Sequence, residues 1–569
     1  MRPGYYSIII ILFSFAVYFN TLYNNFVFDD IPNVLENHWI KDIRNVREIF
    51  STHLAGFNNG YSSSYYRPVI QLVFMFNYHI FGFAPWGYHF INILLHAAVS
   101  VVVFLMASKI FNVQNRIPSL FSIPFLVALF FATHPIHTEA VSWVAGVMDL
   151  SFTFFYLLSL YFYICSYDQR PFRGAFFFSV VMFFISSLCK EPAITLPFLL
   201  FAYDAFFRNK GTSATVYIKR YVPYIFVSAA YLLMRFAAIK GVAPSKGFHE
   251  LNTYQYVINV FPLFINYMKK LVLPLELSAL HPFSPVSSIF EPKCLLSIFL
   301  TIVIGILAFL FRNKKTVLFG LSLVVIPLLP ALYIPGIAGE SVFAERYLYL
   351  PSVGFVLILG YLYGIGLERA GRKGALLAIV SIGLIAIYSI GTFERNQVWK
   401  DSYSLWADTV TKSPQSAVAH EYFGYALYSQ GRLDEAIEQY QIALSLNPKR
   451  VDSRINLGVA YALKGWTDQA IAHYKAGLTL RPDDADGHMN LGLAFLAKEQ
   501  VEDAIGECSL ALNINPNSAG AHNCLGIAYA TKGLIDKAIY HFQESVRMDP
   551  DNINYRNNFA LFYNMRDSR

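Results

Sequence analysis

Long apolar stretches alternate with short polar segments over the first two thirds of the chain, and this pattern ends near Thr392. Most stretches hold roughly 17 to 22 residues, close to the ~20 that a helix needs to cross the core of a bilayer. About eleven stretches qualify: 5–23, 88–108, 119–134, 149–166, 174–189, 192–207, 221–239, 294–311, 316–334, 348–366 and 374–392. We therefore expect a polytopic helical membrane domain over residues 1–393.

Two further stretches, 67–83 and 254–274, are apolar but less uniform. Either could cross the membrane. The alternation of basic loops is preserved if both lie along the outer membrane face or dip into it, so we expect interfacial or re-entrant segments. Whether they cross stays open at this point.

A repeat with a period of 34 residues follows the apolar part. Four kinds of residue keep separate phases of this period: Pro414, Pro448, Pro482, Pro516 and Pro550; Gly424, Gly458, Gly492 and Gly526; Ala436, Ala470, Ala504 and Ala538; and Tyr440, Tyr474, Cys508 and Phe542. In tetratricopeptide repeats the small residues let two antiparallel helices approach closely, and proline ends the second helix. We therefore predict an all-α chain that ends in an α-solenoid of tetratricopeptide repeats.

The period also sets the expected domain boundaries. We expect a linker over 394–413 and a repeat domain over 414–569, with repeats 414–447, 448–481, 482–515 and 516–549 and a partial fifth, 550–569, as a C-terminal cap. Such solenoids offer a concave face that suits extended peptides. The array is therefore predicted to bind an acceptor protein, and the narrower alternative is that it supports only oligomerisation or assembly.

The chain has five cysteines. Cys508 and Cys524 fall in neighbouring repeats and could pair in an oxidising compartment, but buried unpaired cysteines are the commoner case and the one we expect. The other three, Cys165, Cys189 and Cys294, lie within or beside predicted spans and show no metal-ligand spacing.

Composition supports the membrane class: 55% of the residues are hydrophobic, 14% are charged, and the mean hydropathy is +0.42. The net charge of +7 does not indicate nucleic acid, because many Lys and Arg residues stand in short loops between spans without a basic aromatic platform. If Met1 is cytoplasmic, these basic loops face the cytoplasm. The long loops and the repeat array would then face the periplasm from a bacterial inner membrane, or the lumen of the endoplasmic reticulum in a eukaryote.

Ionisable residues gather in segments on the predicted outer side. They are Asp29 and Asp30 in "FVFDDIPNV", Arg67 in "YYRPV", His134, His137, Glu139 and Asp149 in "HPIHTEAVSWVAGVMD", Lys190 and Glu191 in "CKEPAIT", and Glu345 and Arg346 in "AERYLYLPS". Charged residues near a membrane are costly and mark functional positions. A carboxylate that deprotonates a hydroxyl, beside cations that hold a phosphate leaving group, suits transfer from a phosphate-linked donor. Such a donor must lie in the membrane, because no nucleotide pool exists outside the cytoplasm.

These residues also have simpler interpretations. Paired aspartates at the end of a span can be a solvated boundary, and neighbouring Lys-Glu or Glu-Arg residues can be structural ion pairs. His134 and His137 near Glu139 could ligate a metal, but a histidine beside proline is more often a hydrogen-bonded packing residue. We therefore predict no cofactor, with a divalent metal as the less favoured alternative.

Five segments keep a distinctive order ahead of the repeats: "FVFDDIPNV", "YYRPVIQLVFMFNYHIFGFAPWGYHFINILLHA", "HPIHTEAVSWVAG", "CKEPAIT" and "AERYLYLPSVGF". In this order they resemble the transmembrane and tetratricopeptide-repeat O-mannosyltransferases and their bacterial relatives, which belong to the GT-C superfamily of polytopic glycosyltransferases. The resemblance implies inverting transfer of a sugar from a polyprenyl-phosphate carrier, dolichyl phosphate mannose in the animal members. The acceptor would be Ser or Thr of a protein on the outer or lumenal side.

By the same resemblance Asp29 is the general base and Asp30 its partner, and which of the two acts stays open. Arg67, Lys190 and Arg346 would neutralise the donor phosphate. The residues expected to line the acceptor or sugar pocket are His134, His137, Glu139, Glu191 and Glu345. The array has fewer repeats than the animal members usually carry, so the acceptor and the donor sugar also stay open.

Two other functions remain possible on the sequence. One is a non-enzymatic envelope scaffold that recruits partners through its repeats, although a single span would suffice as its anchor. The other is a transporter for a lipid-linked sugar. A transporter would place ionisable residues near mid-span and show paired repeats in its membrane half, and we see neither pattern.

Overall fold

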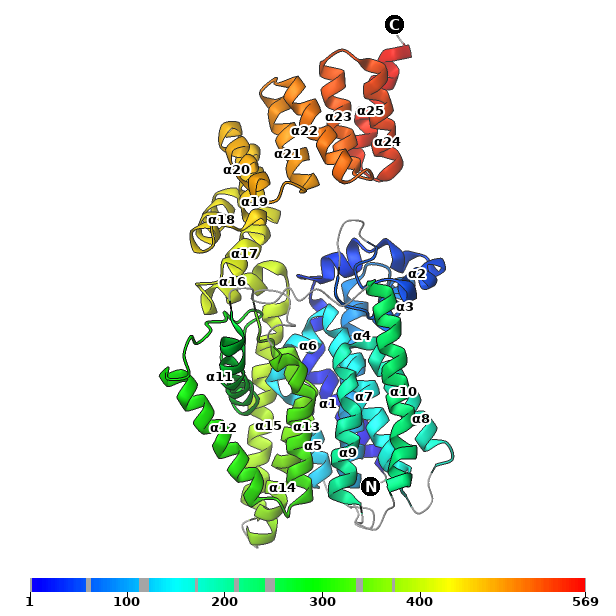
Figure 1. The fold of residues 1–569 in the computed structure, drawn as a ribbon, viewed down its shortest axis with the longest axis vertical. Coiled ribbons are helices and arrows are strands. Elements are labelled where there is room, and N and C mark those ends of the chain that lie inside the picture. The colour runs from blue at the N-terminus through cyan, green and yellow to red at the C-terminus, as the bar shows by residue number, and fades with distance from the viewer. Residues whose placement is uncertain are drawn as a thin grey trace. The chain divides into compact units, whose positions relative to one another are not determined.

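The computed structural model describes residues 3–57, 63–111, 122–168, 172–208, 214–240, 251–333, 341–370 and 374–567. The chain forms two compact units, Met1–Asp408 and Thr409–Arg569. Within the described residues the regular secondary structure is helical and no strand occurs (Figure 1). This confirms the predicted all-α class.

The first unit carries the apolar helices. Eight helices of its described part are long and apolar enough to cross a bilayer: α1 (Pro3–Tyr18, extended by a 3-10 turn to Tyr23), α4 (Pro85–Ile110), α7 (Val147–Cys165), α10 (Ala214–Ile239), α12 (Pro292–Leu310), α13 (Lys315–Leu332), α14 (Pro351–Ala370) and α15 (Gly374–Asn396). The shorter or more polar helices are α2 (Val46–Ser51), α3 (Pro68–Phe81), α5 (Ile123–Thr133), α6 (Thr138–Ser142), α8 (Ala175–Cys189), α9 (Leu196–Phe207) and α11 (Thr253–Val272). The protein is therefore a multi-pass membrane protein, as predicted.

Three of the eleven predicted spans are short. The segments expected over 119–134, 174–189 and 192–207 form α5, α8 and α9, which have 11, 15 and 12 residues. A helix of 12 residues covers roughly 18 Å, less than the ~30 Å of the hydrocarbon core. α5 ends at His134 and α8 at Lys190, because the chain turns there into 3-10 segments that have proline in their first two positions. By length alone, eight of the eleven predicted spans can cross.

The two less uniform stretches, 67–83 and 254–274, form α3 and α11. Neither helix is among those long and apolar enough to cross. Near the end of α11, Lys270 is 5% exposed and its Nζ donates to the carbonyls of Leu275 and Glu276 over 2.5 and 2.7 Å. Both segments stay predicted as interfacial or re-entrant.

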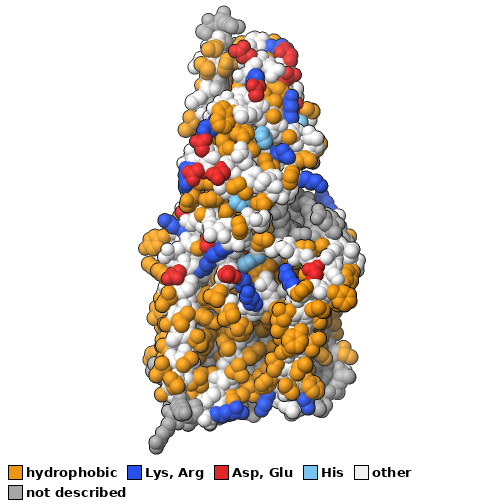
Figure 2. Space-filling view, turned by 90° about the vertical axis from the view of Figure 1, so that its left-hand side faces the viewer, with side chains coloured by type: hydrophobic (Ala, Val, Ile, Leu, Met, Phe, Trp, Pro, Cys, Tyr) orange, Lys and Arg blue, Asp and Glu red, His pale blue; other side chains and the backbone are white. Residues whose placement is uncertain are grey.

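The surface of the first unit is apolar where its helices face outward. Large side chains such as Phe226 on α10, Phe299 on α12 and Ile387 on α15 are more than half exposed. Figure 2 shows hydrophobic side chains over the sides of this unit, and Lys and Arg side chains at the end where Figure 1 marks the N-terminus. Water-soluble surfaces rarely expose so much contiguous apolar area, so this surface fits contact with lipid.

The segment expected to be a linker, 394–413, is helical. α15 continues into it, and α16 (Ser402–Lys412) follows after one 3-10 turn. Trp399 and Trp406 in this segment are each 2% exposed. Burial of two indole rings holds the segment on the first unit, and the boundary between the units falls inside α16, after Asp408.

Four helix pairs and one final helix form the second unit. They are α17 (Ala417–Ser429) with α18 (Leu433–Leu446), α19 (Val451–Leu463) with α20 (Thr467–Leu480), α21 (Ala485–Ala497) with α22 (Val501–Ile514), α23 (Ala519–Thr531) with α24 (Ile535–Met548), and α25 (Ile553–Asp567). Each pair lies within one predicted repeat, and α25 lies within the partial fifth. The side chains of Ser416, Asp484 and Ser518 accept from backbone N–H groups three residues later, which fixes the starts of α17, α21 and α23.

The glycine and large-residue phases meet inside each pair. A Cβ at Gly424 would lie 2.7 Å from the Tyr440 ring, and a Cβ at Gly458 would lie 2.6 Å from the Tyr474 ring. These distances are shorter than carbon atoms can approach without a shift of the helices. Glycine therefore allows the first helix of a repeat to rest on the aromatic ring of the second, which explains the spacing of both phases.

The two repeat cysteines are paired. The structure joins Cys508 and Cys524 in a disulfide with a Cα–Cα distance of 6.1 Å, inside the usual range. The expectation of unpaired cysteines was wrong, because α22 and α23 pack together and place both side chains in one buried cluster with Leu525. The other three cysteines are buried and free.

A pair of histidines in the fourth repeat has a pH-dependent contact. Nδ1 of His522 lies 3.0 Å from Nδ1 of His541. Burial lowers the pKa of both rings, that of His541 to about 4, and the charge of His522 lowers the pKa of His541 further. Glu544 raises both pKa values and Arg547 lowers that of His522, but burial is the largest cause for each ring.

Acid should therefore loosen the fourth repeat. Each folded-state pKa lies below the unfolded value of about 6.5, so the unfolded chain binds more protons and stability falls as the pH drops from about 6.5 towards 4. Amide hydrogen exchange of α23 and α24 in the full-length protein at several pH values measures this. His541→Gln copies the His420–Gln439 pair of the first repeat and should remove most of the pH dependence of exchange. If exchange in the variant depended on pH as strongly as in the unmodified protein, the histidine pair would not be its cause.

Candidate functional site

Asp30, in the first loop after α1, is held in a fixed position. It is 0% exposed, its Oδ2 accepts from the N–H of Val27 over 3.0 Å, and its Oδ1 accepts from the N–H of Ala145 over 2.7 Å. Burial raises its pKa well above the ordinary value, and these N–H groups partly oppose that rise. Both oxygens are engaged, so Asp30 fastens the loop to the turn before α7.

The surroundings of Asp29 differ from those of Asp30. The Asp29 side chain is half-buried, and within the described ranges no hydrogen bond or ion pair reaches its carboxylate. Burial raises its pKa, while the charges of Arg346 and Arg67 lower it. A general base works best when its pKa is brought towards the working pH. The surroundings of the two carboxylates thus differ, and Asp29 as the general base stays a prediction.

Arg67, which precedes α3, is paired with Glu191. Its Nη2 lies 2.8 Å from Oε2 of Glu191 and its Nε lies 3.2 Å from the same oxygen. Its Nη1 lies 3.1 Å from the Met148 sulfur, and the guanidinium carbon lies 4.3 Å from the Tyr65 ring centroid. Burial raises the pKa of Glu191, but Arg67 outweighs it and holds that pKa below the ordinary value, so the pair is ionised.

Two further ion pairs lie beside one tyrosine ring. The Arg346 guanidinium is paired with Glu139, and its backbone N–H donates to Oε2 of the same residue over 2.8 Å. Nζ of Lys190 lies 2.5 Å from Oδ1 of Asp149, and both side chains are less than a tenth exposed. The Tyr347 ring centroid lies 5.0 Å from the Lys190 Nζ and 5.2 Å from the Arg346 guanidinium carbon.

We call these seven residues the charge cluster: Asp29, Arg67, Glu139, Asp149, Lys190, Glu191 and Arg346. Its members act on one another electrostatically. Burial lowers the pKa of Lys190, and the charges of Arg67 and Arg346 add to that lowering although Asp149 opposes it. An entering phosphate would compete with the carboxylates for the two guanidinium groups, whose planar donors match phosphate oxygens.

The two histidines expected in the acceptor or sugar pocket lie in the core. His134 and His137 are each 0% exposed; a ring nitrogen of His134 lies 3.1 Å from the Leu271 carbonyl, and one of His137 lies 2.8 Å from the Ser352 hydroxyl. Burial lowers the pKa of both, that of His134 to about 4, so both rings are neutral. Their contacts favour the packing interpretation. The described residues contain no three His, Cys, Asp or Glu side chains placed to hold a metal ion, and the absence of a cofactor stays a prediction.

Glu345 is also engaged elsewhere. It is 1% exposed, and its Oε1 accepts from the N–H of Ser278 over 2.7 Å and lies 2.8 Å from Nε2 of His281. It fastens the loop after α11 to the segment before α14. The structure thus brings Glu139 and Glu191 into the charge cluster. Glu345 acts electrostatically on Glu139 but has its hydrogen bonds outside the cluster, and the two histidines lie in the core.

Some residues around the charge cluster had no predicted role. Asp149 was visible as an outer-side carboxylate, but its partner Lys190 is 41 residues away in the sequence. Tyr65 lies two residues before Arg67 and Tyr347 directly follows Arg346, and each ring contacts its arginine. An aromatic residue within two positions of an arginine in "YYRP" and "ERYLY" was the signal that could have indicated cation–π contacts.

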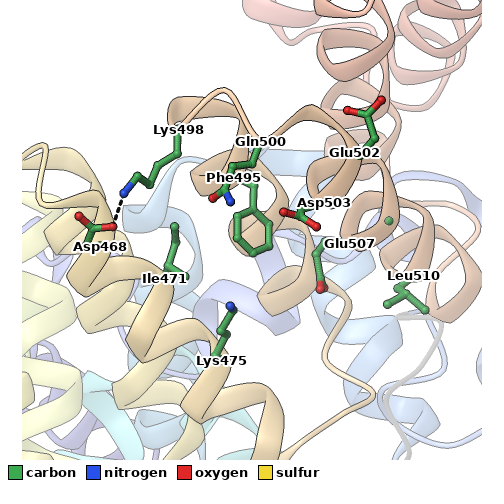
Figure 3. Close-up of a pocket in the computed structure, with 11 residues that line it drawn as sticks. Asp468, Ile471, Lys475, Phe495, Lys498, Gln500, Glu502, Asp503, Glu507 and Leu510 are labelled. Atoms are coloured by element: carbon green, nitrogen blue, oxygen red, sulfur yellow. Dashed lines mark hydrogen bonds and ion pairs between the residues drawn. The ribbon is translucent and has the colours of Figure 1, made fainter.

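The repeat unit has a pocket of its own, with a volume of about 730 Å³. Its lining comes mainly from α20 and α22, the second helices of neighbouring repeats, and Figure 3 shows Phe495 between Ile471 on one side and Asp503 on the other. Nζ of Lys475 lies 5.3 Å from the Phe495 ring centroid. Gly506 lies inside α22, and a Cβ there would meet nothing within 4 Å.

Fold and site together define a multi-pass helical membrane protein with a tetratricopeptide array and a cluster of buried and partly buried ion pairs beside one unengaged carboxylate. Its homologues are protein O-mannosyl-transferases. The chain is 26% identical to Protein O-mannosyl-transferase TMTC3 of Homo sapiens over 78% of this chain and 52% of that protein. It is 28% identical to Protein O-mannosyl-transferase F38B6.6 of Caenorhabditis elegans, over 78% and 62%, and 28% identical to Protein O-mannosyl-transferase TMTC1 of Homo sapiens, over 78% and 55%. The chain thus spans about half to three fifths of the length of these relatives, and the predicted resemblance is confirmed.

The family described as TPR repeat matches residues 424–465 and 464–499. Two solved structures resemble the repeats. One is YrrB, a TPR protein with an unusual peptide-binding site, at 22% identity and a TM-score of 0.25 over 29% of this chain and 84% of that one. The other is TTC0263, a thermophilic TPR protein in Thermus thermophilus, at 19% identity and a TM-score of 0.26 over 32% and 94%. The family match confirms the predicted tetratricopeptide array.

Proposed function

We propose that the protein is a membrane glycosyltransferase that moves a sugar from a polyprenyl-phosphate-linked donor to Ser or Thr of a protein. The observation that carries this proposal is the charge cluster, in which the unengaged Asp29 carboxylate lies within electrostatic reach of Arg67 and Arg346. The names of the homologous proteins support a protein acceptor and a mannosyl donor.

In the proposed reaction the acceptor hydroxyl gives its proton to Asp29 while its oxygen attacks the anomeric carbon of the sugar. The bond from that carbon to the phosphate oxygen breaks, the configuration inverts, and polyprenyl phosphate leaves with the bonding electrons. Arg67, Lys190 and Arg346 would stabilise the negative charge released on the phosphate. Because these cations already have carboxylate partners, the chain can keep them buried before the donor arrives.

We assign the reaction to the periplasmic or lumenal side, with the N-terminus in the cytoplasm. Two observations support this side. Lys and Arg side chains gather at the end of the first unit where the N-terminus lies, as expected for a cytoplasmic face. The Cys508–Cys524 disulfide in the second unit is of a kind that persists in oxidising compartments.

The comparison of cells with and without this chain tests the proposal. Intact-mass spectrometry of their envelope or lumenal proteins should show a sugar-sized mass that is present only with the chain, and purified protein in nanodiscs should transfer labelled mannose from polyprenyl-phosphate mannose to the same acceptor. An unchanged glycan pattern, with partners still retained by the repeats, would contradict the enzyme and favour a scaffold.

The array is proposed to hold the acceptor protein, and the pocket that Gly506 lines between α20 and α22 is proposed as one contact. A glycine inside a helix costs about 1 kcal/mol relative to alanine, and this one allows no closer packing within the chain. Close approach of a bound polypeptide to α22 would explain why glycine is present there.

Substitutions at Gly506 should separate stability from binding. Gly506→Ala is expected to stabilise α22 by about 0.5–1 kcal/mol, seen as slower amide exchange in the full-length protein. Gly506→Leu should fill the pocket and raise KM for the protein acceptor with kcat unchanged. Ala472→Leu is the matched control, because Ala472 is exposed at the same phase one repeat earlier, and it should leave KM unchanged. If both leucine substitutions raised KM equally, the pocket would have no part in acceptor binding.

A further inference from the structure

Phe28, directly before Asp29, has a backbone conformation that phenylalanine rarely adopts. Its φ is +53°, in the left-handed region where the Cβ of an L-residue crowds its own backbone at a cost of about 1–2 kcal/mol. Such strain persists only where the surroundings hold the residue in place, and it concentrates at functional sites. The neighbours of Phe28 therefore indicate what the strain achieves.

Two indole rings hold the Phe28 ring. The Trp143 ring is stacked on it, with centroids 5.8 Å apart and an interplanar angle of 28°, and the Trp406 ring meets it edge-on at 5.3 Å and 80°. Trp143 is also stacked on Trp399 at 6.0 Å. All three indoles are at most 5% exposed. We call Phe28, Trp143, Trp399 and Trp406 the aromatic clamp.

The backbone just before Phe28 is fixed as well. The indole N–H of Trp143 donates to the Val27 carbonyl over 3.4 Å, and the N–H of Asn25 donates to the Lys400 carbonyl over 2.8 Å. The clamp and these bonds use residues from three distant parts of the chain. The loop can therefore not relax to an ordinary φ without breaking several buried contacts at once.

We propose that Phe28 is a positioning residue: the aromatic clamp holds its left-handed backbone so that the Asp29 carboxylate lies in the charge cluster with Arg67 and Arg346 while Asp30 stays anchored to Ala145. This rests on the proposed function, because it makes Asp29 the base. Neighbouring side chains in a loop point in different directions, so the backbone rotation at residue 28 selects which aspartate enters the charge cluster. Glycine would adopt the same φ without strain, but it would lack the ring that fixes the loop.

Three variants of the full-length protein test this with two readouts. Phe28→Gly and Trp406→Ala remove the clamp, and Trp406→Phe keeps an edge-on ring. The first two should lower kcat about 10²-fold, the cost of displacing a reacting group by about 1 Å, with the donor KM unchanged.

The pH dependence of kcat should change as well. Burial is the main cause that raises the Asp29 pKa, so an Asp29 side chain released into water should move the acid limb of the kcat profile to lower pH. Trp406→Phe should restore most of kcat and the original limb.

Carbodiimide labelling of carboxyl groups, read by mass spectrometry, supplies the second readout and needs no transfer. In the unmodified protein Asp29 should label and Asp30 should not, and the clamp variants should lose this selectivity. Trp39→Ala removes a buried indole outside the clamp and should leave the selectivity intact.

The outcomes separate the two proposals. If the unmodified protein transfers no sugar, the proposed function fails, and the labelling selectivity still decides whether Phe28 positions Asp29. Unchanged selectivity in Phe28→Gly and Trp406→Ala overturns the positioning role, whatever their kcat, since a loss of activity alone would then reflect general damage to the fold.

Discussion

Asp29→Asn should abolish most sugar transfer and leave the protein folded in the membrane. Asparagine keeps the shape of the side chain but cannot take the proton of the acceptor hydroxyl, and a general base contributes about 10²- to 10⁴-fold to the rate. No described group donates to the Asp29 carboxylate, so the substitution leaves no buried partner unpaired. The measurement is kcat in nanodiscs at equal protein levels.

Asp30→Asn is the contrasting variant. The nitrogen of the new amide group cannot accept a hydrogen bond. Either the N–H of Val27 or the N–H of Ala145 therefore loses its acceptor. We expect a loss of stability of about 1–3 kcal/mol and a kcat near normal in the folded fraction. Loss of transfer in a fully folded Asp30→Asn protein, with transfer retained by Asp29→Asn, would make Asp30 the base.

Arg346→Met should strongly destabilise the protein. Glu139 is 2% exposed and accepts from both the guanidinium and the backbone N–H of Arg346. Removal of one partner of a buried ion pair costs about 3–5 kcal/mol, because the other charge is left without compensation. Transfer should be lost as well, because the donor phosphate loses a guanidinium. Thermal unfolding in nanodiscs and kcat measure the two effects.

A second substitution separates stability from catalysis. Glu139→Gln added to Arg346→Met removes the unpaired charge and should recover most of the lost stability, while transfer stays absent. Recovery of transfer in the double variant would show that Arg346 acts only as the partner of Glu139. The phosphate would then be held by Arg67 and Lys190.

The sequence predicted those features that depend on local spacing. The 34-residue phases predicted the repeats because the contact of Gly424 with Tyr440 recurs at a fixed distance along the chain. The apolar stretches predicted the membrane unit because the length and apolar character of a spanning helix can be read from consecutive residues. Both signals need only residues that are close in sequence.

The partners within the charge cluster could not be predicted in this way. Arg67 and Glu191 are 124 residues apart, and their contact depends on how α3 and α8 pack. The different surroundings of the Asp29 and Asp30 carboxylates were hidden for the same reason, because the loop that carries them contacts Trp406 through the Phe28 ring. The spacing of Cys508 and Cys524 likewise did not indicate that their side chains face each other, so the expectation of free thiols was wrong.

The position of the unit boundary inside α16 limits how the chain can be cut. A fragment that ended at residue 393, the predicted edge of the membrane domain, would lose Trp399 and Trp406. Phe28 would then lack its edge-on ring contact, and Trp143 would lack its stacking on Trp399. A fragment that ended at Asp408 would remove the last turn of the helix that carries Trp406. The chain between Lys412 and Ser416, the N-cap of α17, is where a different repeat array can be grafted with the ring contacts of Phe28 intact.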